Sequence, residues 1–187
     1  MKRGPGSEVW LTPKPLVDLL GPFDLDPCAA PEPRPWPTAR EHYTKAEGDG
    51  LGRPWNGFVW CNPPYGRETG RWLERLASHP GGGIALVFAR TETDWFFEHV
   101  WKKGRGFLFL KGRVRFHRPD GTRNLYTPAP SVLIAYGDEA SRRLYCSGLA
   151  GCSVVAWEPR LSRPEAGAVG LVNTHISERY RNEGAGK

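Results

Sequence analysis

Residues 57–65 read Gly-Phe-Val-Trp-Cys-Asn-Pro-Pro-Tyr. The first five have the apolar pattern of a buried strand, and the two prolines end it because they fix φ and remove two backbone N–H donors. Asn62 and Tyr65 are therefore expected at the carboxyl end of a strand. Ligands bind at that end in open α/β sheets, so we interpret this tetrapeptide as the functional site.

The chemistry of the tetrapeptide suits a planar ring that carries an –NH₂ group. The side-chain carbonyl of Asn62 and the backbone carbonyl of Pro63 can each accept one of the two amine hydrogens. Pro64 stiffens the backbone that follows, and the ring of Tyr65 offers a flat surface for stacking. A purely structural turn is the alternative interpretation, and the position of the motif directly after a strand argues against it.

Apolar runs and helical periodicity along the rest of the chain predict an α/β fold. Residues 84–88 are apolar at every position, as in a strand covered on both faces of a sheet. Strands that alternate with helices favour a three-layer sandwich around a mostly parallel central sheet. The expected strands are residues 23–26, 57–61, 84–88, 106–110, 113–116, 132–136 and 152–157, and the expected helices are residues 12–21, 67–78 and 93–103.

The length of 187 residues fits one domain. We expect it to span residues 1–158, and we expect residues 159–187, where apolar periodicity fades, to form a flexible tail. No apolar run reaches the length of a membrane span. The four cysteines form no C-x-x-C pair, which argues against a zinc site or a disulfide framework and favours a cytoplasmic location, in a bacterium or a phage-infected cell.

Positive charge is concentrated in one segment. The chain has 26 Lys and Arg against 20 Asp and Glu, a net charge of +6. Residues 102–123 hold eight basic residues and one acid, so this segment carries +7 and the rest of the chain is close to neutral. Such local charge predicts contact with a polyanion, with a solvated basic face as the alternative.

Four further segments accompany the Asn-Pro-Pro-Tyr motif. They are Trp10-Leu11-Thr12-Pro13, Leu25-Asp26-Pro27-Cys28-Ala29, Asp49-Gly50-Leu51 and Gly112-Arg113-Val114-Arg115-Phe116. In this order they resemble the compact phage-type DNA N6-adenine methyltransferases (Dam-like), a family of S-adenosylmethionine-dependent amino-methyltransferases. The resemblance covers approximately residues 8–137.

The resemblance implies a Rossmann-like methyltransferase fold that transfers a methyl group from S-adenosylmethionine to N6 of adenine in duplex DNA. The target base would be flipped out of the helix, and Asn62, Pro63, Pro64 and Tyr65 would form the catalytic site. No general base is expected, because the methylated ammonium is itself strongly acidic. No metal is expected either. The residues implied to bind the cofactor are Trp10, Thr12, Pro13, Asp26, Ala29, Asp49 and Leu51.

Two features depart from the family pattern. No G-x-G follows Asp26, where Ala29 and Ala30 stand instead. The stretch between Asp26 and Asn62 is too short for two full helix–strand units, which implies an abbreviated sheet with one short strand near residues 41–44. The acid that normally holds the cofactor ribose is then not assignable from the sequence, and Glu41 is one candidate for it.

The basic segment is expected to hold the DNA backbone. Two of its arginines alternate outward if Val114 faces the core, and the turn at residues 118–123 could enter a groove. The predicted DNA-binding residues are Lys111, Arg113, Arg115, Arg118 and Arg123.

Other functions remain open at this stage. Cytosine N4, adenine in RNA and a glutamine amide in a protein all present a comparable amine. A nucleic-acid-binding module with a degenerate methyltransferase fold would also account for the missing G-x-G. Cys28 is expected to be a small buried residue rather than a nucleophile, and no obligate protein partner is evident. The resemblance suggests a phage or restriction-modification role.

Overall fold

The computed structural model describes residues 10–118, 120–122 and 129–155 of the chain. The expected tail at 159–187 and one predicted DNA contact, Arg123, lie outside these ranges. The elements in chain order are α1 (Lys14–Leu20), β1 (Leu25–Ala29), β2 (Glu41–Thr44), the 3-10 turn η1 (Lys45–Glu47), β3 (Val59–Cys61), α2 (Thr69–Ala77), β4 (Gly83–Phe88), α3 (Asp94–Phe96), the π-helix η2 (Phe97–Trp101), β5 (Gly106–Leu110), β6 (Ser131–Tyr136), α4 (Asp138–Cys146) and β7 (Gly151–Val155).

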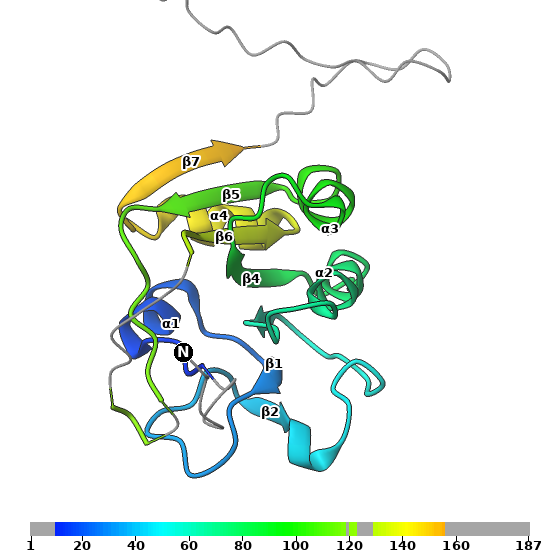
Figure 1. Ribbon diagram of the computed structural model, residues 1–187, viewed down its shortest axis with the longest axis vertical. Helices are drawn as coiled ribbons and strands as arrows, with labels where there is room; N and C mark the ends of the chain where they lie inside the picture. Colours follow the sequence, from blue (N-terminus) through cyan, green and yellow to red (C-terminus); the bar gives the residue numbers. More distant parts are fainter. Residues whose placement is uncertain (1–9, 119, 123–128, 156–187) are drawn as a thin grey trace, which may run out of the picture. The chain divides into compact units, whose positions relative to one another are not determined.

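Within the described ranges, seven strands form one mixed sheet in the order β2-β1-β3-β4-β6-β5-β7 (Figure 1). In one half, β2, β1, β3 and β4 pair in parallel, so their carboxyl ends lie at one edge. In the other half, β6 is antiparallel to β4 and to β5, and β7 is antiparallel to β5. The α/β class is confirmed. The expected mostly parallel pairing is wrong for this second half, because β6 inserts between β4 and β5 in the opposite direction.

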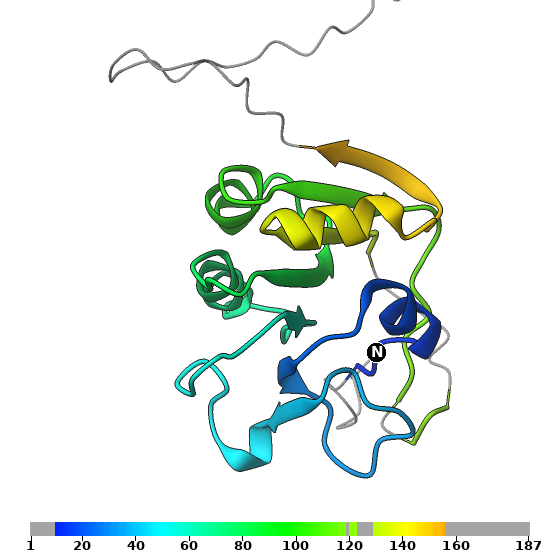
Figure 2. The ribbon, with the colours of Figure 1, turned by 180° about the vertical axis from the view of Figure 1, so that it is seen from behind.

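Helices cover both faces of the sheet (Figures 1 and 2). On one face, α2, α3 and η2 bury a cluster that includes Trp72 and Phe96, and α1 and α4 cover the other face. Strand β3 alternates between the two, since Val59 and Cys61 face the first cluster and Trp60 faces the second. None of the helices in the described part of the chain is long and apolar enough to cross a membrane.

Strand β1 is a central strand that runs through a proline. It was expected to end at Pro27, but it continues to Ala29 and pairs with β2 and β3. Pro27 has no N–H to donate, and the pairing with β2 shifts between Asp26 and Ala29. A bulge in the strand thus accommodates the proline, which is why the predicted end was wrong.

The connection from β1 to β3 is short, as predicted. Strand β2 confirms the strand expected near residues 41–44, and η1 is a single turn. No α-helix lies between β1 and β3, where every residue is described. The connection between β1 and β3 is therefore the part that is shortened. The sheet itself is not, because its antiparallel half adds three strands.

Residues 113–116, expected to form a strand, run outside the sheet. Gly112 adopts a φ of +79° and turns the chain out of β5. The segment then meets the N-terminal segment through one bridge, in which the Leu11 N–H donates to the His117 carbonyl (2.9 Å) and the His117 N–H donates to the Leu11 carbonyl (3.0 Å). The predicted strand is wrong because the backbone of residues 113–116 has no neighbouring strand in the described part of the chain.

The first helix lies inside the range of residues 12–21 expected for it, but it is shorter at its start. Pro13 is the N-cap of α1, and Lys14 is the first helical residue. The Thr12 side chain makes no capping hydrogen bond and lies outside the helix. The end of the helix at Gly21 is confirmed.

Two later helical segments also differ from expectation. Residues 93–103 were expected to form one helix, but they divide into the short α3 and the π-helix η2. Helix α4 was not predicted, because its apolar positions within a charged sequence are few, and only Ala140 and Leu144 are buried.

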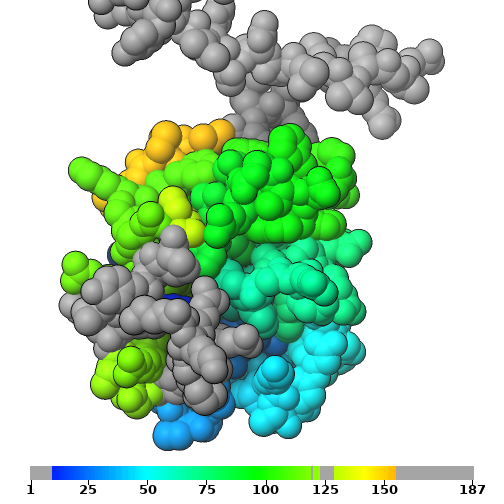
Figure 3. Space-filling view, in the orientation of Figure 1, coloured from blue at the N-terminus to red at the C-terminus, as the bar shows by residue number. Residues whose placement is uncertain are grey.

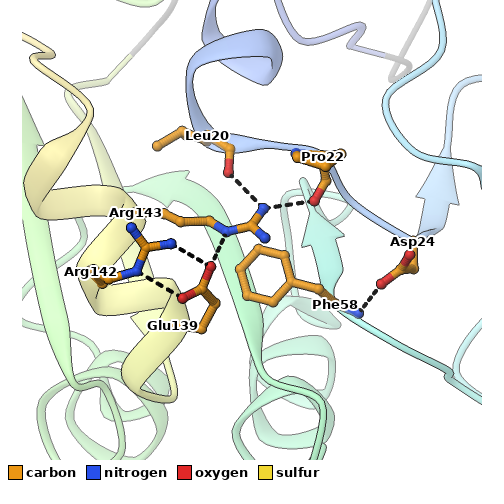
Figure 4. Close-up of polar contacts among 7 residues, drawn as sticks. All are labelled: Leu20, Pro22, Asp24, Phe58, Glu139, Arg142 and Arg143. Atoms are coloured by element: carbon orange, nitrogen blue, oxygen red, sulfur yellow. Dashed lines mark hydrogen bonds and ion pairs between the residues drawn. The ribbon is translucent and has the colours of Figure 1, made fainter.

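Arg143 ties α4 to the segment that precedes β1 (Figure 4). Its guanidinium donates to the Pro22 carbonyl (2.7 Å) and to the Glu139 carboxylate (2.7 Å), and it lies 4.3 Å from the centroid of the Phe58 ring. Phe58 in turn donates its N–H to the Asp24 carboxylate (2.8 Å). These contacts hold the start of β3, the strand that leads into the predicted site.

Candidate active site

Asn62 directly follows β3, and its side chain is held at both ends. Its Nδ2 donates to the Trp10 carbonyl (3.1 Å), and its Oδ1 accepts a hydrogen bond from the Tyr65 hydroxyl (3.0 Å). The amide is therefore fixed in one orientation. Because a carbonyl oxygen has two acceptor positions, Oδ1 can accept one further hydrogen bond.

The two prolines after Asn62 present their carbonyls differently. Thr69, the first residue of α2, donates its hydroxyl to the Pro64 carbonyl (3.0 Å) and accepts the Gly66 N–H (3.1 Å). Among the described residues, no donor bonds to the Pro63 carbonyl. The loop is thus closed by α2 and leaves one backbone acceptor beside Asn62.

Four aromatic rings from four separate segments form a cluster at this loop. Tyr65 stacks on Phe88, with ring centroids 4.0 Å apart and planes 11° apart. Phe116 meets Tyr65 edge-on at 6.5 Å and Trp10 edge-on at 5.5 Å. Burial raises the pKa of the Tyr65 hydroxyl well above its usual range, so this group stays protonated and donates to Asn62.

The N-terminal segment connects this cluster to the proline-rich loop at residues 31–37. Trp10 holds Asn62 through its carbonyl, while the carbonyl of the buried Thr12 accepts a hydrogen bond from Trp36 Nε1 (2.9 Å). The Trp36 ring also meets the His117 ring edge-on at 5.0 Å. The predicted cofactor residues Trp10, Thr12 and Pro13 therefore lie in one segment beside Asn62.

Asp26 is buried and bonded within its own surroundings. One carboxylate oxygen accepts the Cys28 N–H (3.1 Å), and the other accepts the hydroxyl of Thr38. Burial raises the pKa of Asp26 to about 6, an effect that these hydrogen bonds partly offset. Asp26 thus fixes the loop after β1, and the predicted Ala29 is the buried last residue of that strand.

The Asp-Gly-Leu turn lies directly against β1. A Cβ on the buried Gly50 would stand 2.0 Å from the Pro27 carbonyl oxygen, so only glycine permits this approach. Asp49 is exposed and accepts the Leu51 N–H (3.0 Å), while the Leu51 side chain packs on the core. Two sequence segments that lie far apart, Asp-Pro and Asp-Gly-Leu, are thereby brought together.

The two cysteines near the site link β1 to β3. The sulfurs of Cys28 and Cys61 are 3.8 Å apart. Burial, followed by the contact with Cys61, raises the pKa of the Cys28 thiol well above its usual value. A thiol held protonated is a poor nucleophile, which favours the structural role expected for it.

Glu41 does not reach this edge of the sheet. It is the first residue of β2, whereas Asn62 follows the last residue of the parallel strand β3. The candidate ribose acid is therefore wrong. Glu47, which follows the end of β2, is exposed at the correct edge, and the Thr44 N–H that it accepts (3.0 Å) lowers its pKa.

Part of the basic segment is exposed next to the aromatic cluster. Val114 packs against the core and Phe116 reaches Tyr65, while the intervening charged side chains project to solvent. Figure 3 shows the segment in lime green along one side of the molecule. In the described part of the chain, none of the predicted DNA-binding residues forms an ion pair. The exposed residues are Lys111, Arg113, Arg115 and Arg118.

Two of the hollows in the surface of the described residues border segments named above. One, of about 560 Å³, follows α2 and is bordered by Leu51, Trp55 and Arg75. The other, of about 460 Å³, opens at the loop that follows β3, where Tyr65 and Phe88 form part of its wall.

Phe88 and Trp36 were not among the predicted site residues. Phe88 ends β4 just as Cys61 ends β3, so the rule that ligands bind at strand carboxyl ends could have identified it. Trp36 lies in the proline-rich loop, and no local pattern indicates which segment its ring contacts.

The geometry describes an α/β protein with a fixed amide and an aromatic cluster at the carboxyl edge of its parallel strands. A model of the DNA N-6-adenine-methyltransferase (Dam) family matches residues 3–141. This match spans most of the chain, and the chain belongs to that family. Membership implies an enzyme that methylates N6 of adenine, with DNA as substrate and S-adenosylmethionine as methyl donor. No curated protein and no solved structure matches the chain.

Proposed function

We propose that Asn62 and the Pro63 carbonyl accept the two N6 hydrogens of an adenine that has been flipped out of duplex DNA. The observation that carries this proposal is the fixed Asn62 amide, whose Oδ1 is oriented by Tyr65 and keeps one acceptor position free. The neighbouring Pro63 carbonyl has no donor among the described residues. Two acceptors from adjacent residues match in number the two hydrogens of an exocyclic amine.

These acceptors address the main chemical difficulty of the reaction. The lone pair of an adenine amine is delocalised into the ring, so the nitrogen is a weak nucleophile. Acceptors that bind the amine hydrogens favour a more tetrahedral nitrogen and stabilise the positive charge that develops on it. The remaining contribution is positioning, with the nitrogen held about 3 Å from the methyl carbon.

Tyr65 supplies the stacking surface in this proposal. Phe88 covers one face of its ring, so the base stacks on the opposite face, and Phe116 borders the ring edge-on. The rigidity of this cluster supports a preformed site for the base. Stacking on an aromatic ring is worth about 1–3 kcal/mol per base, which offsets part of the cost of flipping.

The residues near β1 fit S-adenosylmethionine. Asp49 is exposed and uses one carboxylate oxygen for the Leu51 N–H, which leaves the other for the adenine amine of the cofactor. Ala29 keeps the end of β1 small where a G-x-G was expected, and the segment from Trp10 to Pro13 borders the methionine end. When bound, the cofactor supplies an activated methyl group.

The arrangement of helices on both faces of the sheet supports a Rossmann-like methyltransferase sandwich. Its parallel half carries the motifs, and Asp26 contributes by fixing the loop after β1 rather than by facing solvent. The exposed arginines at positions 113 and 115 project beside the aromatic cluster, which supports a role in holding DNA phosphates.

Mass spectrometry of nucleosides tests this function. Unmethylated duplex DNA is incubated with the protein and S-adenosylmethionine, digested and compared with RNA treated in the same way. We expect N6-methyladenine in DNA alone. N4-methylcytosine or methylated RNA would reassign the substrate. No product, together with no cofactor binding in calorimetry, would favour the degenerate binding module.

A further inference from the structure

The hollow at the loop that follows β3 extends beyond the residues that the proposed reaction uses. Its volume of about 460 Å³ falls within the range of pockets that hold small ligands, about 300–1,000 Å³. Three aromatic side chains line it, and polar groups from the turn after β4 complete it. The lining residues used below are Tyr65, Phe88, Arg90, Glu92, Thr93 and Trp95.

The turn that forms this wall is held by hydrogen bonds. The Arg90 carbonyl accepts both the N–H (3.0 Å) and the hydroxyl (2.8 Å) of Thr93, and the Arg90 N–H donates to the Phe88 carbonyl (2.8 Å). The Ala89 N–H donates to the Pro130 carbonyl at the start of β6 (2.9 Å). The wall is therefore preformed rather than assembled on binding.

Trp95 reaches the hollow because α2 carries a glycine opposite it. A Cβ on Gly70 would lie 3.0 Å from Trp95 Cβ, so a larger residue would press Trp95 away from α2. Two residues later the chain enters the π-helix η2, a rare conformation that is often found at functional sites. Trp95 remains partly exposed at this point and lines the hollow.

The charges at the rim suit a nucleotide. Arg90 is exposed, and no carboxylate among the described residues pairs with its guanidinium. Glu92 and Thr93 offer hydrogen-bonding groups for a base edge, and Trp95 offers a flat ring. Arginine binds phosphate, and aromatic rings stack on bases of any sequence.

We propose that this hollow binds a nucleotide that flanks the target adenine, with its base against Trp95 and its phosphate on Arg90. The proposal rests on the proposed function, because the hollow shares Tyr65 with the site for the flipped base. A flanking nucleotide held in this way would draw the target strand away from its partner and keep the flipped adenine next to Asn62.

The test uses a duplex with one methylation site, in which the nucleotides flanking the target are replaced in turn by abasic residues. With wild-type protein we expect about tenfold weaker DNA binding for one of these replacements, as for the loss of one stacked base. Trp95→Ala should bind the intact duplex about tenfold more weakly and should lose no further affinity on the abasic duplex. Trp95→Phe, which keeps a stacking ring, should stay within about threefold of the wild-type protein.

Trp101→Ala is the matched control, because Trp101 lies in η2 and packs on Phe107 without lining the hollow. It should keep the wild-type sensitivity to the abasic replacement. The proposal is overturned if Trp95→Ala stays as sensitive as the wild-type protein. It is also overturned if Trp95→Ala abolishes methylation without weakening DNA binding, since the hollow would then hold the target base itself. Failure of the proposed function would appear separately, as full methylation by Asn62→Ala.

Discussion

Asn62 and Arg115 are both expected to contact DNA, yet the structure holds their side chains in opposite ways. The Asn62 amide is partly buried and bonded at both ends, whereas Arg115 is exposed and pairs with no carboxylate in the described part of the chain. The difference follows from their tasks. Methyl transfer depends on the position of one nitrogen, while phosphate contact requires only charge and reach. Substitutions at the two places should therefore change different kinetic quantities.

The largest effect is expected for Asn62→Ala. It removes a fixed acceptor for the reacting amine, and loss of one such group in a transition state typically costs about 10²–10³ in rate. Single-turnover methylation at saturating DNA and cofactor should fall by at least about 100-fold, while both dissociation constants stay within a few-fold. Asn56→Ala, at an exposed asparagine, is the control. If Asn62→Ala lowered only the affinity for DNA, Asn62 would act in binding, as Arg115 is expected to, and not in methyl transfer.

Tyr65→Phe should give a smaller loss in the same quantity. The ring and its stacking on Phe88 remain, but Asn62 loses the hydroxyl that orients its Oδ1. We expect kcat to fall by about fivefold with little change in KM for DNA, as for one neutral hydrogen bond of about 1 kcal/mol. A change confined to KM would mean that the hydroxyl does not orient the amide.

The double substitution Arg113→Gln with Arg115→Gln should act on binding instead. KM for DNA should rise, and the slope of log affinity against log salt should become shallower by about one for each lost phosphate contact. The maximal rate should stay near the wild-type value. Arg40→Gln with Arg142→Gln removes the same charge elsewhere and serves as the control. Equal effects of the two pairs would point to bulk charge rather than to this segment.

The smallest effect on the reaction is expected for Asp26→Asn, whose influence lies in stability. Burial raises the Asp26 pKa from 3.8 to about 6, so the folded state binds this proton more tightly than the unfolded state. Stability should then fall as pH rises from about 4 to 6, by the order of 3 kcal/mol. The amide in the variant cannot titrate, so its urea unfolding should lose that slope. A slope retained in the variant would assign it to another group.

Much of the site was predictable because its residues follow strands. Asn62 to Tyr65 come directly after an apolar run, and β3 places them at the carboxyl edge as expected. The short strand at residues 41–44 followed from the limited length between Asp26 and Asn62, and the structure confirms it. In each case a local pattern carried the information.

The errors arose where distant parts of the chain decide the outcome. The bulge that lets β1 pass through Pro27 depends on its pairing with β2. Residues 113–116 alternate like a strand, but in the described part of the chain the nearest backbone pairing is the bridge between Leu11 and His117. The stacking of Phe88 on Tyr65 and the contact of Trp36 with Thr12 likewise join segments whose proximity no local pattern reveals.

The central claim is that an oxygen at Asn62 accepts a hydrogen of the reacting amine. The most direct measurement compares the single-turnover methylation rates of the wild-type protein, Asn62→Asp and Asn62→Ala under saturating conditions. Aspartate keeps an oxygen for the amine but loses the donor to the Trp10 carbonyl. We therefore predict a rate between the other two, at least about ten times that of the alanine variant, as for one retained hydrogen bond to the reacting group. Equal rates for the aspartate and alanine variants would contradict the account.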